Sequence, residues 1–442
     1  MDETATLTAG ARLHVDDLHR SVSSRQVAAM TFLNEIVAEF PAAISFAPGA
    51  PYEPFFADVE VGPLLDTFVA ARRAAGLSAE AVRRQLFQYG PSQGIINDLV
   101  AAALRADEAL DVQPESIVMT VGCQEALFLT LLALHPPGSV LAVPDPSYVG
   151  VTAAAEALAI PIHPVPDDGA GPDLAALRVA AARERAAGRR LRALYVSPDF
   201  ANPSGSRLTL AARHRLLETA ADLDLIVVED NAYAFTAAAD DRLPSLKSLD
   251  REGRVVHTGT FSKVAVPGAR VGYVVADQWV ESRLGPPVRL ATMIAAGKNA
   301  VTLNTSPLAQ AVIGGLLIEH GGSLAALGRR KAEQLRSNRA VLLERLVHHF
   351  GKPDRPDARV RWQAPEGGYF VQMELPVEAD DALLRYSAET FGVLWTPMRG
   401  FYLGAGGERR IRLSCSALEH TEIVDGVARL AGFVGALPGN RR

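Results

Sequence analysis

Short apolar runs alternate with amphipathic stretches through the middle of the chain. The apolar runs cover residues 116–121, 140–144, 161–165, 191–196, 225–229, 255–258 and 271–275. Stretches with apolar residues at helical spacing lie between several of them, at 124–135, 149–158, 173–187 and 209–223. Strands that are apolar throughout are buried on both faces, and their alternation with helices is typical of a mostly parallel sheet. The pattern therefore predicts an α/β fold.

The two ends of the chain differ from the middle. Residues 24–40 are amphipathic with helical spacing, and residues 44–54, rich in proline and glycine, are typical of an extended linker. After about residue 305 the pattern is helical to 350, and then short strands mix with helices. We expect a large domain over 61–315 with a mostly parallel sheet between helices. A smaller α+β domain over 316–442 would be joined by the N-terminal segment, 1–60.

Composition and charge exclude several classes of protein. The chain has 442 residues, 48% of them hydrophobic and 21% charged, which is ordinary for a globular protein. Its formal net charge of −6 supplies no basic field for nucleic acid or an anionic membrane. The first 17 residues lack the apolar core of a signal peptide, and no run of 18 apolar residues occurs. We expect a cytoplasmic protein with neither a membrane nor a nucleic-acid partner.

The two cysteines, Cys123 and Cys415, are too far apart in sequence for a metal-site motif, so no metal is expected.

Polar residues gather directly after the predicted strands. In an open α/β sheet, ligands bind at the carboxyl ends of the strands. The residues found there are Gly122, Cys123 and Gln124 after the first run, Tyr148 after the second, Asn202 after the fourth, Asp230 and Tyr233 after the fifth, and Thr260, Ser262, Lys263 and Arg270 after the sixth. Most of these have an ordinary structural explanation when taken alone, such as a helix cap or a turn. A purely structural role for Lys263 is hard to motivate, because burial of an unpaired ammonium is unfavourable.

Taken together, these side chains suit one cofactor. Lys263 is one of only five lysines, and a lysine held out of water loses its proton easily and becomes a Schiff-base nucleophile. A carboxylate at the end of a buried strand, here Asp230, can pair with a protonated pyridine nitrogen. Two hydroxyl groups, Arg270 and a helix N-terminus can hold a phosphate, and a tyrosine ring can stack on a flat ligand. This set describes pyridoxal 5′-phosphate.

The sequence also resembles a known family. The segments Asn202-Pro-Ser-Gly205, Asp230-x-x-Tyr233, Ser262-Lys263 and Arg270 resemble the fold-type I, class I/II aminotransferases. Longer strings, among them 45–52 and 267–278, are similar to the 3,5-dihydroxyphenylglycine transaminase branch of that family.

The resemblance implies roles for individual residues. Lys263 would bind the cofactor covalently and move the proton, Asp230 would pair with the pyridinium, and Tyr148 would stack on the ring. Asn202 and Tyr233 would bind the phenolate oxygen. The phosphate would be held by the N–H groups around Gly122, Cys123 and Gln124, with Thr260, Ser262 and Arg270.

The resemblance also implies residues that contact the substrate and the partner subunit. Arg412 would bind the substrate α-carboxylate, and Gly49 would let the backbone approach the substrate. Tyr89 would reach the phosphate of a neighbouring subunit, so a homodimer with active sites at the interface is expected.

The function implied is transfer of an amino group between an α-amino acid and a 2-oxo acid, in natural-product metabolism and on an arylglycine-type substrate. An alternative is another pyridoxal phosphate reaction on the same scaffold: elimination, oxidation, or carbon–carbon bond and ring formation. A non-catalytic effector-binding domain is a third hypothesis, which the negative net charge argues against.

Candidates for the side-chain pocket are Arg20, Tyr52, Phe55, Phe56 and Trp395. Arg399 would either reach an acidic substrate group or lie solvated in its loop.

Overall fold

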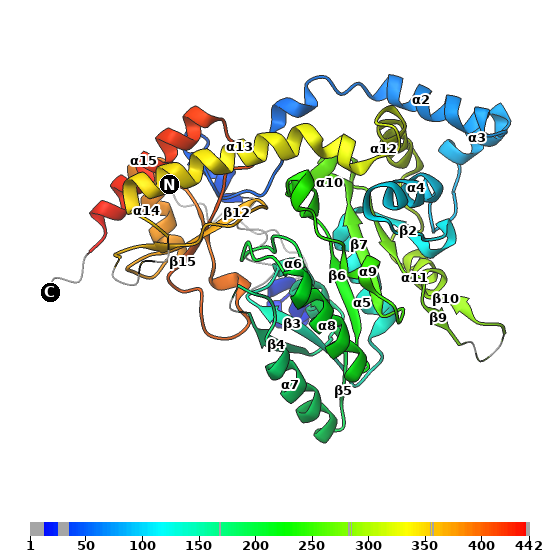
Figure 1. Cartoon of the computed structure of the whole chain (residues 1–442), viewed down its shortest axis with the longest axis horizontal. Coiled ribbons are helices and arrows are strands. Elements are labelled where there is room, and N and C mark those ends of the chain that lie inside the picture. Colours follow the sequence, from blue (N-terminus) through cyan, green and yellow to red (C-terminus); the bar gives the residue numbers. More distant parts are fainter. Residues whose placement is uncertain are drawn as a thin grey trace.

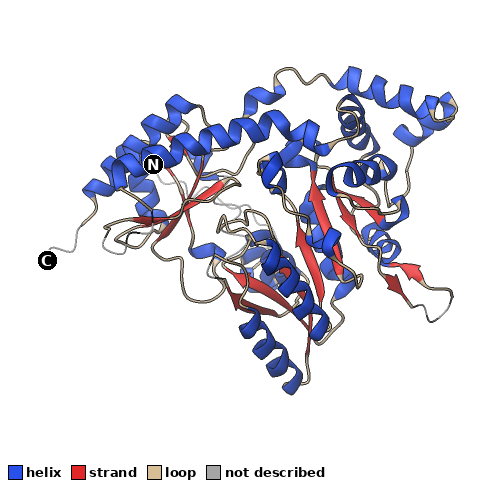
Figure 2. Cartoon of the chain, viewed as in Figure 1, coloured by secondary structure: helices blue, strands red, loops and turns tan. Residues whose placement is uncertain are grey.

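The computed structural model describes residues 13–24, 35–167, 169–281, 283, 285–353, 355 and 358–438. A large part of the chain forms helices around a central sheet, and a smaller part carries a separate sheet (Figure 1; Figure 2). The long helix α13 (Leu324–Phe350) runs between the two parts (Figure 1).

The central sheet contains seven strands in the order β2-β8-β7-β6-β5-β3-β4. They are β2 (Ile117–Thr120), β3 (Ser139–Asp145), β4 (Ile162–Pro166), β5 (Arg190–Val196), β6 (Ile226–Asp230), β7 (Val255–Thr260) and β8 (Gly272–Val275). Strands β4, β3, β5, β6 and β7 are parallel to one another, whereas β8 runs antiparallel to both β2 and β7. The predicted α/β fold with a mostly parallel sheet is confirmed, and each predicted apolar run overlaps a strand.

Helices cover both faces of this sheet. One face carries α5 (Gly122–Leu134), α6 (Val149–Ala157) and α11 (Leu290–Asn299), and the other carries α7 (Leu174–Ala186), α8 (Leu210–Asp222) and α9 (Leu246–Leu249). Along β3, Leu141 packs against the helices of the first face and Val140 against those of the second, because successive side chains of a strand point to opposite faces. Asp173 and Thr209 accept hydrogen bonds from backbone N–H groups in the first turns of α7 and α8, which explains why both helices begin where they do.

A further group of helices packs at the β2–β8 side of the sheet. These are α2 (Val61–Ala74), α3 (Ala79–Phe87), α4 (Asn97–Glu108), α10 (Phe261–Val264) and α12 (Pro307–Glu319). A short hairpin of β9 (Trp279–Val280) and β10 (Val288–Arg289) precedes α11. Helix α10 is only one turn long, and it presents Lys263 directly after β7.

The smaller part has a four-stranded antiparallel sheet in the order β11-β12-β15-β14. Its elements are β11 (Arg361–Trp362), β12 (Phe370–Glu374), α14 (Asp381–Phe391), β13 (Val393–Leu394), β14 (Thr396–Pro397), β15 (Arg410–Ser414) and α15 (His420–Ala436). Helices α13, α14 and α15 share one core with these strands. The predicted division near residues 60 and 315 stays a prediction.

The N-terminal segment differs from the expected linker. β1 (Ile44–Ser45) pairs in parallel with β13, Phe46 is fully buried, and the Phe46 carbonyl accepts a hydrogen bond from the Ser414 N–H. Paired backbone and a buried aromatic ring fix this segment in the smaller part. Of the helix predicted over 24–40, residues 25–34 lie outside the described residues, and residues 35–39 are helical.

Among the described helices, none alone is long and apolar enough to cross a membrane; α12 and α13, bent by 85° at their junction, pass that test only as a pair.

Candidate active site

A cavity of about 730 Å³ lies beyond the carboxyl ends of β5, β6 and β7, between the two parts of the chain. Twelve of the predicted site residues line it: Gly49, Cys123, Gln124, Tyr148, Asn202, Asp230, Tyr233, Thr260, Ser262, Lys263, Arg270 and Arg412. Gly122 lies next to the wall, against Arg270. Tyr89 lies outside this cavity and is 87% exposed.

Lys263 extends from α10 into the cavity. Its Nζ donates a hydrogen bond to the Gly49 carbonyl at 2.6 Å and lies 5.9 and 5.4 Å from the ring centroids of Tyr233 and Tyr369. Burial lowers the pKa of Lys263 to about 8, and the charges of Arg412 and Arg270 act in the same direction. An amine that loses its proton this easily can attack a carbonyl group.

Asp230 stands at the end of β6 with neutral donors on both carboxylate oxygens. The Tyr195 hydroxyl donates to Oδ2 at 2.8 Å, and the Cys123 thiol lies 3.6 Å from Oδ1. Burial raises the pKa of Asp230, and among the described residues no cation forms an ion pair with it. A cationic ring nitrogen would supply the partner that this carboxylate lacks.

Three segments converge into a cradle for an anion. Arg270 donates from Nη1 to the Ser262 hydroxyl at 3.1 Å, and the Thr260 hydroxyl accepts from the Ser262 N–H at 3.1 Å. Gly122 has φ +72°, and a Cβ there would lie 2.4 Å from Arg270 Nη2. A Cβ on Gly272 would lie 2.7 Å from the Cys123 nitrogen. The two glycines therefore let Arg270 and β8 approach the N-terminus of α5, whose free N–H groups favour a phosphate.

Arg412, on β15, is buried with an incomplete set of acceptors. It donates from Nη1 to Asn202 Oδ1 at 2.6 Å and from Nη2 to the Ala47 carbonyl at 3.0 Å, while its buried Nε has no partner. Burial lowers the pKa of Arg412 to about 10. A guanidinium surrounded by neutral acceptors, with an N–H group left over, fits a ligand carboxylate.

The side chain of Gln124 contacts Tyr148 and the backbone of α6. Its Oε1 accepts from the Tyr148 hydroxyl at 3.2 Å, and its Nε2 donates to the Gly150 carbonyl at 2.7 Å. The side chain thus fixes the orientation of the Tyr148 ring, and the phosphate role expected at Gln124 would rest on its backbone alone.

Several residues of the cavity were missed from the sequence. Tyr195, Phe370 and Phe401 line it, and Tyr195 was read only as part of an apolar strand. A hydroxyl group in a fully buried run is a usable signal, because it needs a hydrogen-bond partner. The rings of Phe370 and Phe401 come from the smaller part of the chain and carry no such local signal.

The predicted side-chain pocket residues are mostly elsewhere. Of those five candidates only Phe56 lines the cavity. Trp395 is fully buried in the smaller core, and the Tyr52 hydroxyl donates to Glu419. Arg399 also lies outside the cavity, with Nε 3.2 Å from Glu408 Oε1. The ion pair favours a role for Arg399 within its loop over contact with an acidic substrate group.

A buried ion pair beneath the site was also missed. Glu229, next to Asp230 on β6, accepts from His257 Nδ1 at 2.8 Å and from the backbone N–H groups of Leu246 and Lys247. Burial opposes the charge on Glu229, but these donors outweigh it and hold its pKa below the usual value. The pair ties β6 to β7 and α9, and so fixes the strand end that carries Asp230.

The donor set of this cavity fits pyridoxal 5′-phosphate. A deprotonatable lysine, a buried carboxylate that has no cationic partner in the described part of the chain, and an anion cradle lie around one space. Arg412, with its unpartnered Nε, adds a position for the carboxylate of an amino acid.

Comparison with known proteins agrees with this geometry. Residues 62–430 match the aminotransferase class I and II family. The chain is 43% identical, over 96% of its length and 95% of the relative's, to an (S)-3,5-dihydroxyphenylglycine transaminase of Amycolatopsis orientalis. Its fold is similar to that of an archaeal alanine:glyoxylate aminotransferase, with a TM-score of 0.79 and 26% identity, covering 96% of this chain and 99% of that one.

A second solved structure contains a cofactor derivative. It is the α-aminoadipate aminotransferase LysN of Thermus thermophilus, solved with N-(5′-phosphopyridoxyl)-L-leucine. The TM-score is 0.76 and the identity 30%, covering 95% of this chain and 97% of that one. The chain therefore belongs to the class I and II aminotransferases, and it is a pyridoxal 5′-phosphate-dependent enzyme that transfers an amino group between an α-amino acid and a 2-oxo acid.

Proposed function

We propose that the substrate is an α-amino acid with a neutral aromatic side chain, of the arylglycine type, together with the corresponding 2-oxo acid. The observation that carries this proposal is the set of charges around the cavity. Its described lining holds three cations, Lys263, Arg270 and Arg412, and two carboxylates, Glu53 and Asp230. Since the three cations are assigned to the cofactor amine, the phosphate and the α-carboxylate, none is left for an acidic side chain.

The rest of the lining suits an aryl ring. Apolar groups from both parts of the chain surround the space in front of Lys263, among them Phe56, Val149, Phe370 and Phe401. Glu53 at the wall can accept hydrogen bonds from ring hydroxyl groups. A role in natural-product metabolism is supported by the similarity to the Amycolatopsis orientalis transaminase, whose name gives a dihydroxyphenylglycine as its substrate.

The roles proposed for the site residues follow the chemistry of their positions. When bound, pyridoxal 5′-phosphate supplies an electron sink for the bond changes at the substrate α-carbon. Lys263 would hold the cofactor through Nζ and then move a proton at the α-carbon. Asp230 would keep the ring nitrogen protonated, and Tyr148 would cover one face of the ring.

The remaining contacts orient the ligand. Asn202, whose Oδ1 is occupied by Arg412, would offer its amide N–H groups to the phenolate oxygen, with the Tyr233 hydroxyl beside it. Arg270 and Ser262 would bind the phosphate with the N–H groups at the start of α5. Arg412 would bind the substrate carboxylate with a pair of N–H groups that includes the unpartnered Nε, which fixes the α-carbon near Lys263.

The substrate proposal is tested with the holoenzyme and single amino acids. Conversion of the cofactor to its amino form, followed by absorbance, should proceed with 4-hydroxyphenylglycine and 3,5-dihydroxyphenylglycine. It should be at least about a hundredfold slower with glutamate or 2-aminoadipate, whose second carboxylate would enter the pocket unpaired. Fast conversion with the acidic donors and none with arylglycines would contradict the proposal. Ammonia release without an oxo acid acceptor would instead favour the alternative, another pyridoxal phosphate reaction on the same scaffold.

We also propose that two chains form a two-fold dimer that completes the site. Exposed apolar side chains lie on α3 and its following loop, on α5, and on α11 and the loop after it: Phe87, Tyr89, Leu132, Met293, Val301 and Leu303. The loop after α3 contacts the end of α11, since Ser92 Oγ donates to Asn299 Oδ1 at 2.6 Å. An apolar patch of this kind is typical of a protein interface, and Tyr89 would extend from it toward the partner's phosphate.

Mixing two inactive variants tests the shared site. Refolded mixtures of Lys263→Ala and Tyr89→Ala chains would contain heterodimers with one intact site, which takes Lys263 from one chain and Tyr89 from the other. Activity well above either parent variant is the expected result. Activity no higher than the average of the two, or an active monomer in sedimentation, would contradict the proposal.

A further inference from the structure

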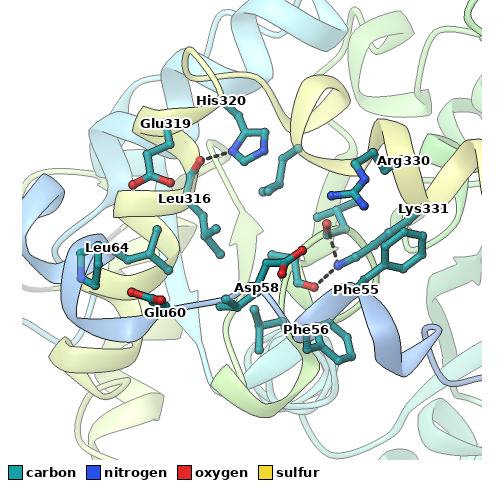
Figure 3. A pocket seen from close by; sticks show the side chains of 16 residues that line it. Phe55, Phe56, Asp58, Glu60, Leu64, Leu316, Glu319, His320, Arg330 and Lys331 are labelled. Atoms are coloured by element: carbon teal, nitrogen blue, oxygen red, sulfur yellow. Dashed lines mark hydrogen bonds between the residues drawn. The ribbon is translucent and has the colours of Figure 1, made fainter.

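A second cavity lies behind the segment that carries Lys263. Its volume is about 380 Å³, and its walls come from the chain around η3 (Glu53–Phe56) and from α2, α12 and α13 (Figure 3). Phe56 lines both this cavity and the active-site cavity. Among the described residues lining the second cavity, every buried side-chain polar atom has a hydrogen-bond partner, so nothing in its walls calls for a ligand.

Lys331 of α13 reaches into this second cavity. Its Nζ donates to the Val264 carbonyl at 3.1 Å and to the Ala265 carbonyl, the dashed contacts of Lys331 in Figure 3. These two residues directly follow Lys263, at the end of the single turn α10. Carbonyl groups at the end of a helix have no partner within the helix, so the Lys331 ammonium caps the turn that presents Lys263.

The same ammonium faces the wall of the substrate cavity. Lys331 Nζ lies 5.1 Å from the centroid of the Phe56 ring, within the range of a cation–π contact. Burial lowers the pKa of Lys331 to about 8. Keeping a cation in such surroundings is unfavourable, and one of only five lysines in a chain rich in arginine is placed here.

Helix α13 contacts both parts of the chain on either side of Lys331. A Cβ on Gly328, one turn earlier, would lie 3.4 Å from Val264, so the helix packs closely on the α10 turn. Farther along, Asn338 Nδ2 donates to the carbonyls of Cys415 and Leu418 in the smaller part. The two hydrogen bonds of Lys331 therefore depend on the position of α13 relative to α10, the turn that carries Lys263.

We propose that Lys331 is a positioning residue for the active site. By capping the Val264 and Ala265 carbonyls it fixes the direction of Lys263, and through Phe56 it fixes one wall of the substrate pocket. This inference rests on the proposed role of Lys263 as the cofactor-binding amine.

The test compares Lys331→Met with a matched control. Arg330→Met removes the neighbouring cation, which lies over Phe55 and is exposed, without touching the α10 carbonyls. In the folded, cofactor-free proteins, Lys331→Met should slow attachment of pyridoxal phosphate about tenfold or more, because a small misplacement of a reacting group has effects of this size. Arg330→Met should attach it at the parental rate.

A substrate comparison separates positioning from general loss of stability. In the holoenzyme, kcat/KM of Lys331→Met should fall further for an arylglycine than for alanine, whose methyl group is too short to depend on the Phe56 wall. Lys331→Arg, which keeps the positive charge and N–H donors for both carbonyls, should recover most of the attachment rate. A variant that only melts at lower temperature, with attachment and substrate preference unchanged, would overturn the proposal.

Two further outcomes are distinguishable. If Lys331→Met does not fold, Lys331→Gln keeps an amide NH2 group without the charge, and its attachment rate should lie below those of the parent and of Lys331→Arg; a parental rate would overturn the inference. If Lys263 is not the cofactor-binding amine, the parent protein itself will carry the cofactor on another residue, which is a failure of the proposed function and is seen without any Lys331 variant.

Discussion

The thiol of Cys123 lies 3.6 Å from Oδ1 of Asp230, opposite the Tyr195 hydroxyl on Oδ2. The thiol also lies 3.4 Å from Thr258 Oγ1, and burial raises its pKa well above the usual value, so it stays protonated. A cysteine at the start of α5 thus touches the carboxylate proposed to bind the cofactor ring.

This contact predicts different effects of two substitutions at Cys123. A hydroxyl is a stronger donor than a thiol, so Cys123→Ser should lower the proton affinity of Asp230 and weaken cofactor binding by up to about tenfold. Cys123→Ala removes the donor and should leave binding equal or tighter. Equilibrium titration with pyridoxal phosphate measures both. A loss of equal size in both variants would mean that the thiol only fills space.

Arg412 should set the affinity for the substrate carboxylate. Arg412→Lys replaces a fork of N–H groups by a single ammonium, and kcat/KM should fall roughly ten- to a hundredfold, as for the loss of hydrogen bonds to a charged group. The matched control is Arg399→Lys, because Arg399 pairs with Glu408 outside the cavity. Equal losses in the two variants would argue against a direct contact between Arg412 and the substrate.

Gly122 should matter for cofactor binding beyond its backbone conformation. Gly122 and Gly188 have φ of +72° and +71°, but only at Gly122 would a Cβ meet Arg270, since nothing lies within 4 Å at Gly188. Alanine at either position should lower the free energy of unfolding by about 1–3 kcal/mol. Only Gly122→Ala should also weaken cofactor binding, measured by titration of the folded protein. Unchanged binding in that variant would show that Arg270 moves aside freely.

The pH dependence of cofactor attachment follows from the lowered pKa of Lys263. Below pH 8 the amine is mostly protonated and cannot attack an aldehyde, so the attachment rate should rise about tenfold per pH unit and level off above pH 8. Arg412→Leu removes one of the charges that lower this pKa, and its midpoint should shift upward. Stopped-flow absorbance gives the profile. A parental midpoint near the ordinary lysine value of 10.5 would contradict the burial argument.

The local chemistry of the site was predictable because it lies at the ends of the strands. Apolar runs located β5, β6 and β7, and the polar residues that follow them, such as Asp230 and Lys263, line one cavity. The pattern of apolar runs does not predict contacts between segments that are distant in sequence. The Cys123 thiol on Asp230 and the Phe370 ring under Arg412 depend on tertiary packing, which has no local period.

The N-terminal segment illustrates the same limit. Proline and glycine in 44–54 favoured a linker, yet β1 pairs with β13 and the Gly49 carbonyl accepts from Lys263. A Cβ at Gly49 would lie 2.8 Å from the Phe370 ring, so this glycine is required by close packing. Turn-forming residues were correctly read as breaking regular structure, but their role in the wall of the site was decided by partners more than 200 residues away.

The central claim is that the amine of Lys263 carries the cofactor. Borohydride reduction of the holoenzyme, followed by proteolysis and mass spectrometry, locates the residue that carries the pyridoxyl label. The account predicts one label per chain, on Lys263, and none in Lys263→Ala. A label on Lys247, Lys298, Lys331 or Lys352, or a parent protein that binds no cofactor, would contradict it.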